Sequence, residues 1–392
     1  MKSVNRILDK KQYIMDNFIR PNSLLELARV LHEQNISETE YRKHVAQHLE
    51  NKARKRRIPL LGTFELTPLC NLDCKMCYIH LNKDQFCQQD LLPTQIWKSL
   101  IKQASEAGML KAAITGGECL TYPGFDDIYT YLFNMGIYPT IMSNGILIDQ
   151  ERIDFFKQYP PDLLQITLYG SSDDAYEKVT GKRVFNIVYN NLIKIRESNL
   201  RIVLTLTPSK FMKDDIRPLV ETASSLNIPF NINSSLITPR NNTGRRLEDL
   251  SLDQYIEIYQ IRKELNNEIL VSIDPVELPD ENHTGNSKYG LQCGGGRSSF
   301  VIKYDGSMSP CPSLYEINSN PLVIGFNEAW KQINQMADNY PVPEECDECA
   351  YHDYCLLCPA VHRNANRIGH CDPKICERTK RLIREGFIKM RR

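Results

Sequence analysis

The chain has 392 residues, a length that allows more than one domain and a large buried core. Apolar residues make up 42% and charged residues 24%, which is typical of a globular protein rather than a disordered or fibrous one. The 48 basic residues balance the 48 acidic ones, so the net charge does not indicate a nucleic-acid-binding protein. The feature that needs an explanation is the thirteen cysteines, of which three fall between Cys70 and Cys77 and eight between Cys293 and Cys376.

The N-terminus contains no continuous apolar stretch and no signal-peptide cleavage site. No segment approaches the roughly 18 to 20 apolar residues that a membrane span needs. We therefore expect a cytoplasmic protein that has neither membrane nor nucleic acid among its partners. Thiols stay reduced in that compartment, so clustered cysteines are more typical of metal or redox ligands than of disulfides.

Residues 1–55 are predicted to form an N-terminal helical segment, because Leu24, Leu27 and Leu31 share one apolar face. A basic run follows at 52–57. Runs of like charge are usually exposed, so we expect a solvated linker there, with a docking surface for an acidic partner as the alternative.

Between residues 56 and 280, short β-rich segments alternate with helical stretches. The predicted strands are 61–66, 112–115, 138–142, 164–168, 202–206 and 230–233. Helical spacing connects them, for example at Ile96, Leu100 and Ala104 before Gly108. This alternation indicates an α/β fold built of parallel β/α units, in either an open sheet or part of a barrel.

Beyond residue 275 the alternation fades into a region rich in glycine, proline and cysteine. Few long apolar periods occur there, so we expect that this region cannot easily bury a core of its own and that bound metal stabilises it. We place a domain boundary near residue 280. Residues 281–392 then form a second domain that ends in a basic helix.

Three thiols, Cys70, Cys74 and Cys77, directly follow the first predicted strand with the spacing C-x3-C-x2-C. They lie on a loop at the C-terminal mouth of the sheet, where α/β proteins carry their chemistry. A [4Fe–4S] cluster normally has four cysteine ligands, so three would leave one iron open to a substrate or cofactor. The alternatives are a zinc site, which more often has paired C-x2-C units, and a cluster completed by Cys87, which we interpret as a bystander.

Gly116, Gly117 and Glu118 end the second predicted strand. Consecutive glycines allow a ligand to approach the backbone closely, and a neighbouring carboxylate can accept hydrogen bonds from an ammonium group. Such a tripeptide alone usually forms a turn. Its position one β/α unit after the three thiols is what makes it informative.

Together the two motifs resemble the CxxxCxxC and GGE motifs of the radical S-adenosylmethionine (radical SAM) enzymes. The resemblance implies a partial (β/α)6 TIM-like barrel and a [4Fe–4S] cluster that binds the amino and carboxylate groups of S-adenosylmethionine. Reductive cleavage of that cofactor gives a 5′-deoxyadenosyl radical, which abstracts a hydrogen atom from the substrate. A reductant such as a flavodoxin or ferredoxin is implied as the electron donor.

The resemblance also implies roles for single residues around the cofactor. Gly116, Gly117 and Glu118 form the motif that holds the methionyl amine, the last two directly. Met76 would lie beside the adenine.

Two strand-end residues are implied as further pocket residues. Thr167 matches a position on the fourth strand that often carries a ribose-binding serine, and Asn144 ends the third strand facing the pocket. Both side chains could instead be turn formers. The family more often has proline where Cys119 stands, and the default role of that thiol is a small buried side chain.

The C-terminal cysteines resemble the SPASM extension, whose pattern is C-x9–15-G-x4-C, then C-x2-C-x5-C-x3-C, then a last cysteine. One departure is that two residues, rather than three, separate Cys355 from Cys358. The resemblance implies three [4Fe–4S] clusters in all. The ligands would be Cys293, Cys311 and Cys358 for auxiliary cluster I, and Cys346, Cys349, Cys355 and Cys376 for auxiliary cluster II.

Two cysteines compete for the last ligand position. Cys376 follows Asp372 and Pro373, which resembles the DPxC ending common in the family and favours it over Cys371. Auxiliary cluster I then has either an open iron or Cys371 as its fourth ligand. A zinc site on the paired C-x2-C units remains the alternative.

SPASM enzymes include peptide maturases, sulfatase-activating enzymes and enzymes of quinone-cofactor biosynthesis. The aspartate that the sulfatase type carries after its second SPASM cysteine is Pro312 here, so that activity loses support. Our leading prediction is modification of a ribosomally synthesised peptide by cross-linking, thioether formation or epimerisation, which rests on how common that role is among relatives. Residues 1–55 look too short for a winged-helix leader-binding domain, so a separate leader-peptide-binding protein is a candidate partner.

Three other functions stay open at this point. They are a radical SAM enzyme of small-molecule or cofactor biosynthesis, a non-catalytic iron–sulfur electron-transfer protein, and a zinc-stabilised binding module. The electron-transfer hypothesis leaves the motif at Gly116–Glu118 without a role. No side chain can be singled out from the sequence as a general base.

Overall fold

The computed structural model describes residues 38–264 and 290–388, apart from short gaps. The gaps are 83, 88–89, 213–214, 233–236, 238, 241–249, 292, 342, 347–348, 352–353, 356–357 and 359–368. Most of the predicted N-terminal helical segment and the predicted boundary near 280 lie outside the described residues.

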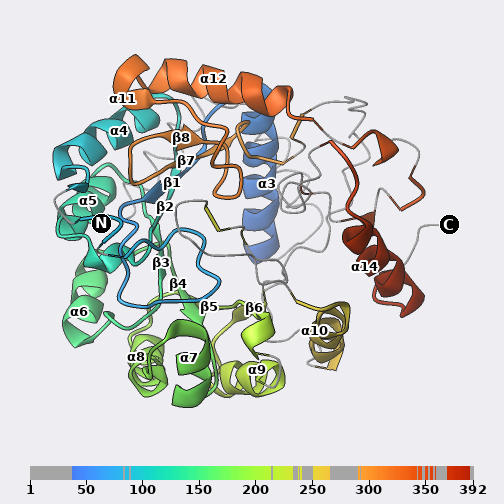
Figure 1. The fold of residues 1–392 in the computed structure, drawn as a ribbon. Helices are drawn as coiled ribbons and strands as arrows, with labels where there is room; N and C mark the ends of the chain where they lie inside the picture. The colour runs from blue at the N-terminus through green and yellow to red at the C-terminus, as the bar shows by residue number, and fades with distance from the viewer. Residues whose placement is uncertain are drawn as a thin grey trace.

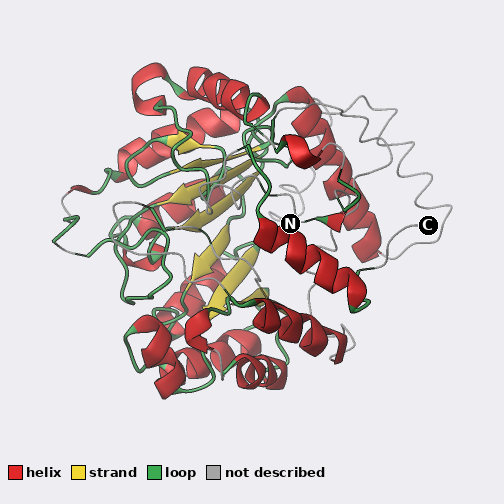
Figure 2. Cartoon of the chain, turned by 45° about the vertical axis from the view of Figure 1, so that its right-hand side comes forward, coloured by secondary structure: helices red, strands yellow, loops and turns green. Residues whose placement is uncertain are grey.

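Eight strands form one sheet in the order β6-β5-β4-β3-β2-β1-β7-β8. They are β1 (Leu61–Glu65), β2 (Lys111–Thr115), β3 (Thr140–Ser143), β4 (Leu163–Leu168), β5 (Ile202–Leu206), β6 (Phe230–Ile232), β7 (Ser299–Ile302) and β8 (Met308–Ser309). All neighbours pair in parallel except β8, which runs antiparallel to β7. Helices lie along the outside of the sheet (Figures 1 and 2), so the predicted α/β fold with a parallel, barrel-like sheet is confirmed.

The helices in the described ranges are α3 (Glu38–Arg56), α4 (Thr94–Glu106), α5 (Phe125–Asn134), α6 (Gln150–Gln158), α7 (Asp173–Thr180), α8 (Phe185–Glu197), α9 (Ile216–Ser225), α10 (Leu252–Glu264), α11 (Pro321–Ile324), α12 (Phe326–Asp338) and α14 (Pro373–Arg384). Side-chain caps explain several starts, because they satisfy backbone N–H groups that have no intrahelical partner. Asp149 accepts from Arg152 N at 3.0 Å and begins α6. Ser172 accepts from Ala175 N at 3.2 Å and begins α7.

Strand residues alternate between a helix-covered face and an inner face. On β4, Leu164, Ile166 and Leu168 are fully buried in the main core. Thr167, of opposite parity, is half-buried and points to the inner face. In the parallel register, Thr167 pairs with Thr205 on β5, and Thr205 pairs with Asn231 on β6. These three residues therefore form one row on the inner face.

The C-terminal region contributes apolar side chains from residues 300–333 to the same core, rather than burying them in a core of its own. β7 pairs with β1 along its length, and Phe300 makes an edge-on contact with Phe64 at 6.1 Å between ring centroids. Phe326 and Trp330 of α12 pack against Phe300 at 5.1 and 6.1 Å. The spacing of Phe326, Trp330 and Ile333 marks one face of an amphipathic helix, a signal hidden by the surrounding glycines and cysteines.

The basic run at 52–57 is also not the predicted solvated linker. It forms the last turn of α3 and the residue after it, where Arg57 adopts φ 58°. Arg57 donates to Asp338 Oδ1 at 2.6 Å and its carbonyl accepts from Trp330 Nε1 at 2.7 Å. The run therefore ends α3 against α12.

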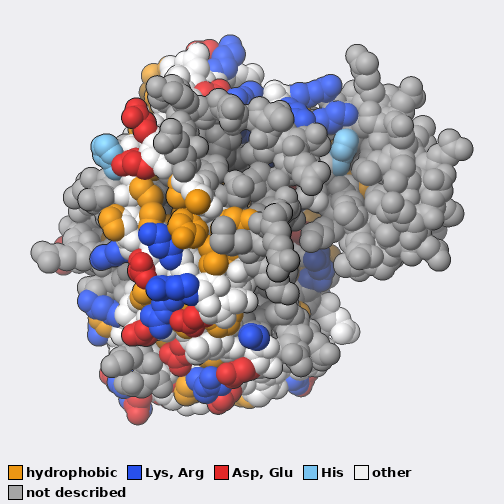
Figure 3. Space-filling view, turned by 90° about the vertical axis from the view of Figure 1, so that its right-hand side faces the viewer, with side chains coloured by type: hydrophobic (Ala, Val, Ile, Leu, Met, Phe, Trp, Pro, Cys, Tyr) orange, Lys and Arg blue, Asp and Glu red, His pale blue; other side chains and the backbone are white. Residues whose placement is uncertain are grey.

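Charged side chains of both signs are interspersed on the face drawn in Figure 3, which agrees with the zero net charge of the sequence. In the described part of the chain, no helix is long and apolar enough to cross a membrane. The predicted basic C-terminal helix is α14, in which Arg378 is buried over the ring of Tyr255 from α10 at 4.6 Å.

Replacing Phe300 by alanine tests whether residues 299–338 fold as part of the barrel. The ring is 1% exposed and contacts three aromatic side chains, so we expect the metal-free protein to lose about 3–5 kcal/mol of unfolding free energy in urea denaturation. Val323→Ala, at a position 76% exposed, should change it by less than about 0.5 kcal/mol. An unchanged midpoint for Phe300→Ala would contradict the shared core.

Candidate functional site

The loop after β1 carries Cys70, Cys74 and Cys77 and is held by the end of α7. Asp73 N donates to Thr180 O and Lys75 N to Val179 O, both at 2.9 Å. These carbonyls belong to the last turn of α7, where no intrahelical donor remains for them. The loop is thereby fixed at the C-terminal edge of the sheet.

Polar N–H groups surround two of the thiols. Leu72 N lies 3.4 Å from Cys70 Sγ, and His80 N lies 3.2 Å from Cys77 Sγ. Hydrogen bonds to sulfur are among the features that tune iron–sulfur clusters, so these thiols fit a thiolate-bound cluster. The fit rests on this donor chemistry, because the described side chains do not include three or more metal-binding groups already gathered around one point.

Burial and neighbouring charge act on the thiols together. Burial, together with the negative charges of Glu118 and Cys77, raises the pKa of Cys70 to about 12. Such a thiol is protonated near neutral pH, so binding of iron displaces a proton from it.

Tyr169, directly after β4, is a neighbour of this loop that the sequence reasoning missed. Burial raises the pKa of its phenol well above the ordinary value, and the charges of all three cysteines add to the shift.

The two glycines of the GGE segment bring the end of β2 against the thiol-bearing loop. A Cβ atom at Gly116, where φ is 148°, would lie 2.5 Å from Thr67 O, and one at Gly117 would lie 2.3 Å from Leu69 O. Gly117 N donates to Thr67 O at 2.6 Å and Glu118 N to Leu69 O at 2.9 Å. The close approach expected at these glycines is therefore a contact between two parts of this chain.

Glu118 is 1% exposed, and its carboxylate is fixed by neutral donors. Ser143 Oγ donates to it at 3.0 Å, Asn144 N at 2.8 Å and Leu120 N at 3.2 Å. Burial raises the pKa of Glu118, and these hydrogen bonds oppose that shift. Among the described residues, no Lys, Arg or His forms an ion pair with it, so a buried carboxylate faces the site without a cation.

Asn144 joins β3 to the thiol-bearing loop. Its Nδ2 donates to Asn71 Oδ1 at 2.7 Å and lies 3.7 Å from Cys70 Sγ. Cys70, Glu118 and Asn144, which the sequence proposes separately, are thus brought together. Sequence reasoning missed Ser143 and Asn71, whose roles depend on contacts between loops, although Ser143 belongs to the Ser-Asn-Gly segment that drew attention to Asn144.

The structure also describes three other residues from the sequence predictions. Thr167 is on the inner face of β4, and Met76 is 7% exposed within the main core. Cys119 is fully buried, with its thiol 3.4 Å from Met142 O, and burial raises its pKa well above the ordinary value. An inert buried thiol is what that environment produces. Cys87 is exposed.

One set of C-terminal thiols gathers around Cys311. A Cβ atom at Gly295 would lie 3.4 Å from Cys293 Sγ and 3.8 Å from Cys311 Cβ, so these two cysteines are neighbours. Burial, together with the charges of Cys293 and Cys358, raises the pKa of Cys311 to about 12. These are the three residues proposed for auxiliary cluster I.

The second set gathers near the start of α14. Burial raises the pKa of Cys355, and the nearby charges of Cys376 and Cys349 add to it. Cys371 Sγ lies 2.9 Å from Cys376 Sγ, which places Cys371 with this set rather than with Cys311. Cys346 stands in a short 3₁₀ helix (Glu344–Cys346), and its side chain lies outside the described part of the structure.

A parallel α/β barrel segment with three thiols after β1 and a glycine-flanked carboxylate after β2 is the arrangement of an enzyme that holds a cofactor at the strand ends. Residues 64–223 match the family model of the radical SAM superfamily. The chain therefore carries a radical SAM domain over these residues.

Two curated relatives come from Bacillus subtilis (strain 168). The sporulation killing factor maturation protein SkfB is 22% identical over 256 residues, which cover 65% of this chain and 60% of SkfB. The antilisterial bacteriocin subtilosin biosynthesis protein AlbA is 23% identical over 352 residues, which cover 85% of this chain and 74% of AlbA. The match to SkfB thus spans less than two thirds of that protein.

Among solved structures, Streptococcus suis SuiB superimposes with a TM-score of 0.65 at 16% sequence identity. The superposition covers 92% of this chain and 88% of SuiB. At that identity the likeness shows a shared fold.

Gly117→Ala tests the backbone contact between β2 and the thiol-bearing loop. The added Cβ meets the Leu69 carbonyl, which cannot rotate away like a side chain, so we expect the metal-free protein to lose about 1–3 kcal/mol in chemical denaturation. Gly295→Ala is the matched control, since its nearest neighbours would lie at an ordinary 3.4 Å. Equal stability of the two variants would show that the contact is not tight.

Proposed function

We propose that this chain is a radical SAM enzyme that cleaves S-adenosylmethionine reductively and abstracts a hydrogen atom from a ribosomally synthesised peptide. The observation that carries the proposal is the buried Glu118 carboxylate, which neutral donors hold beside Cys70 and which has no cationic partner among the described residues. A buried carboxylate is costly unless a cation or a set of hydrogen bonds compensates it. The methionyl ammonium of the cofactor would supply that cation.

When bound, the cluster and S-adenosylmethionine supply the one-electron cleavage that yields the 5′-deoxyadenosyl radical. In the proposal, Cys70, Cys74 and Cys77 hold the cluster. Ser143 and Asn144 orient the Glu118 carboxylate toward the cofactor amine.

Four further residues complete the proposed cofactor site. The contacts of Gly116 and Gly117 keep the carboxylate at the level of the thiols. Thr167 would face the ribose and Met76 the adenine.

The substrate would lie against the inner faces of β5 and β6. Thr205 is 4% exposed, and among the described residues neither its Oγ1 nor Asn231 Oδ1 has a hydrogen-bond partner. The two are register neighbours, so they present two polar atoms side by side. Backbone amide groups of a peptide would satisfy both, and buried polar atoms are rarely left without a partner.

The peptide class is supported by the relatives. SkfB is named for maturation of the sporulation killing factor and AlbA for biosynthesis of the bacteriocin subtilosin, and a structural neighbour is SuiB bound to the precursor peptide SuiA. The reaction in this chain is proposed as cross-linking, thioether formation or epimerisation. A flavodoxin or ferredoxin would donate the electron, and a separate leader-peptide-binding protein would present the substrate.

The two C-terminal thiol sets are proposed as auxiliary cluster sites of a SPASM region at 281–392, following a barrel domain at 56–280. Cys293, Cys311 and Cys358 would hold cluster I. Cluster II would use Cys346, Cys349, Cys355 and Cys376, with Cys371 as a further thiol beside Cys376.

An anaerobic reconstitution tests the class of enzyme. Iron per chain is counted, dithionite and S-adenosylmethionine are added, and 5′-deoxyadenosine is measured. A brown, iron-loaded protein that forms no 5′-deoxyadenosine would fit an electron-transfer protein and overturn the proposal. A colourless protein that contains zinc would fit a binding module.

Cys74→Ala should abolish 5′-deoxyadenosine formation, because it removes one of three ligands of the cluster that receives the cofactor. Cys349→Ala should keep uncoupled cleavage and lose peptide product. Cys87→Ala, at an exposed thiol outside both motifs, should match the unmodified protein. Undiminished cleavage in Cys74→Ala would refute the assigned ligands.

Asn231→Leu should raise the KM for the precursor peptide, while uncoupled 5′-deoxyadenosine formation stays unchanged. Loss of one net hydrogen bond of about 1 kcal/mol corresponds to a roughly fivefold rise. The probe is a peptide from a short open reading frame beside the gene of this chain, if one is found there, and its product is assayed by mass spectrometry. A rise in the S-adenosylmethionine KM instead would assign Asn231 to the cofactor.

A further inference from the structure

At the mouth of the barrel, a buried ion pair joins β1, an inner strand of the sheet, to the segment after β6, an edge strand. Glu65 ends β1, and Arg240 follows β6, which is the edge strand at the far end of the sheet. Arg240 Nη2 lies 2.8 and 2.7 Å from the two carboxylate oxygens of Glu65. The two side chains are 5% and 0% exposed, so the pair is shielded from solvent.

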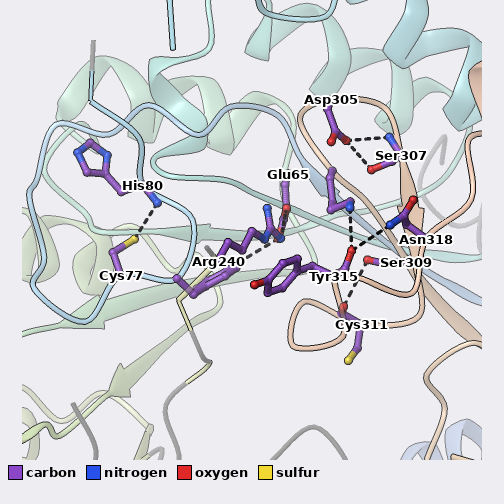
Figure 4. A network of polar contacts seen from close by, with 12 residues as sticks. Glu65, Cys77, His80, Arg240, Asp305, Ser307, Ser309, Cys311, Tyr315 and Asn318 are labelled. Carbon is purple, nitrogen blue, oxygen red and sulfur yellow. Dashed lines mark hydrogen bonds and ion pairs between the residues drawn. The ribbon is translucent and has the colours of Figure 1, made fainter. Parts of the chain in front are cut away.

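The guanidinium of Arg240 also lies between two tyrosine rings, 5.5 Å from the ring centroid of Tyr78 and 5.7 Å from that of Tyr315. Tyr78 directly follows Cys77, and Tyr315 lies four residues after Cys311. Figure 4 shows Arg240 and Tyr315 between these two cysteines. Arg240 therefore contacts one loop from each of two proposed cluster sites.

Hydrogen bonds fix both tyrosines to the same framework. Tyr78 OH donates to Glu65 Oε1 at 3.3 Å, and Arg240 N donates to Tyr78 O at 3.0 Å. On the other side, the buried Lys303 Nζ donates to Tyr315 O at 3.1 Å. The register of β1 and β7 pairs Phe64 with Ile302, which makes Glu65 and Lys303 the next pair along.

A buried ion pair of this kind is weak evidence for a role in stability alone. Removing two charges from water costs several kcal/mol, and apolar replacements of buried pairs are often as stable. What the pair offers is geometry, because a guanidinium binds a carboxylate in one plane and stacks on aromatic rings. Lysine offers neither.

We propose that Arg240 is a positioning residue that holds the loop after Cys77 and the loop after Cys311 at a fixed separation, and that Glu65 cancels its charge between them. The proposal rests on the proposed function only in taking the two loops as cluster sites. The positioning part can be measured without any cluster.

In the metal-free protein, Arg240→Lys keeps the charge and removes the planar contacts. We expect backbone hydrogen exchange to become faster in both loops, 77–81 and 311–317. Arg217→Met is the matched control, because it removes an arginine from the exposed pair with Glu264. Unchanged exchange in both loops of Arg240→Lys, or a change in one loop only, overturns the positioning role.

In the iron-loaded protein, Glu65→Gln removes the negative charge that Glu65 places beside Arg240 in a low-dielectric site. A nearby positive charge favours the reduced cluster, so the midpoint potentials of the clusters on Cys77 and Cys311 should both rise. Glu65→Gln with Arg240→Gln removes both charges and should return both potentials toward the original values. Loss of structural order alone would not produce this rise and reversal.

Each outcome of these measurements supports or overturns one part of the proposal. Unchanged potentials in Glu65→Gln at full iron content overturn the charge-cancelling role. If Glu65→Gln does not fold, the variant that carries both Glu65→Gln and Arg240→Gln is the test. We expect its two midpoint potentials to equal those of the unmodified protein, and different potentials would overturn the charge-cancelling role. Failure of the unmodified protein to take up iron would refute the proposed function and leave the hydrogen-exchange result valid.

Discussion

The site depends on one backbone contact, between the end of β2 and the loop after β1. Gly117 and Glu118 donate their N–H groups to carbonyls of that loop. Neither Gly116 nor Gly117 has room for a side chain. Because this contact sets the height of Glu118 above the sheet, it also determines where Ser143 and Asn144 reach the carboxylate. The thiols, the carboxylate and the end of β3 are thus placed by the main chain rather than by flexible side chains.

Glu65 and Glu118 are both buried carboxylates at neighbouring strand ends, but the groups that bind them differ in charge. Glu65 is neutralised by Arg240 at 2.7 Å, whereas the donors to Glu118 are all neutral. The first carboxylate completes an internal structure and needs nothing further. Among the described residues the second has no cationic partner, and Asn144, whose Nδ2 lies 3.7 Å from Cys70 Sγ, connects it to the thiol-bearing loop.

Much of the fold could be predicted from the sequence, since six strands appear close to where apolar and β-branched residues cluster between helical stretches. β7 and α12 were missed because their apolar residues stand among glycines and cysteines, and the partner of β7 is distant in sequence. Within the site, motifs located the thiols and Glu118. They could not locate Tyr169 or Arg240, whose positions depend on how β4 and β6 curve toward β1.

The register of β1 and β7 has a consequence for the two halves of the chain. β7 belongs to the C-terminal region, yet it extends the barrel sheet and carries Lys303 next to Glu65. The loop with Cys311 follows from β8, which is hydrogen-bonded to β7. The distance between the thiols after β1 and those around Cys311 is therefore set by strand pairing inside one sheet. A hinge between two independent domains would allow that distance to vary, whereas a shared sheet keeps it constant, as electron transfer or substrate positioning between two sites requires.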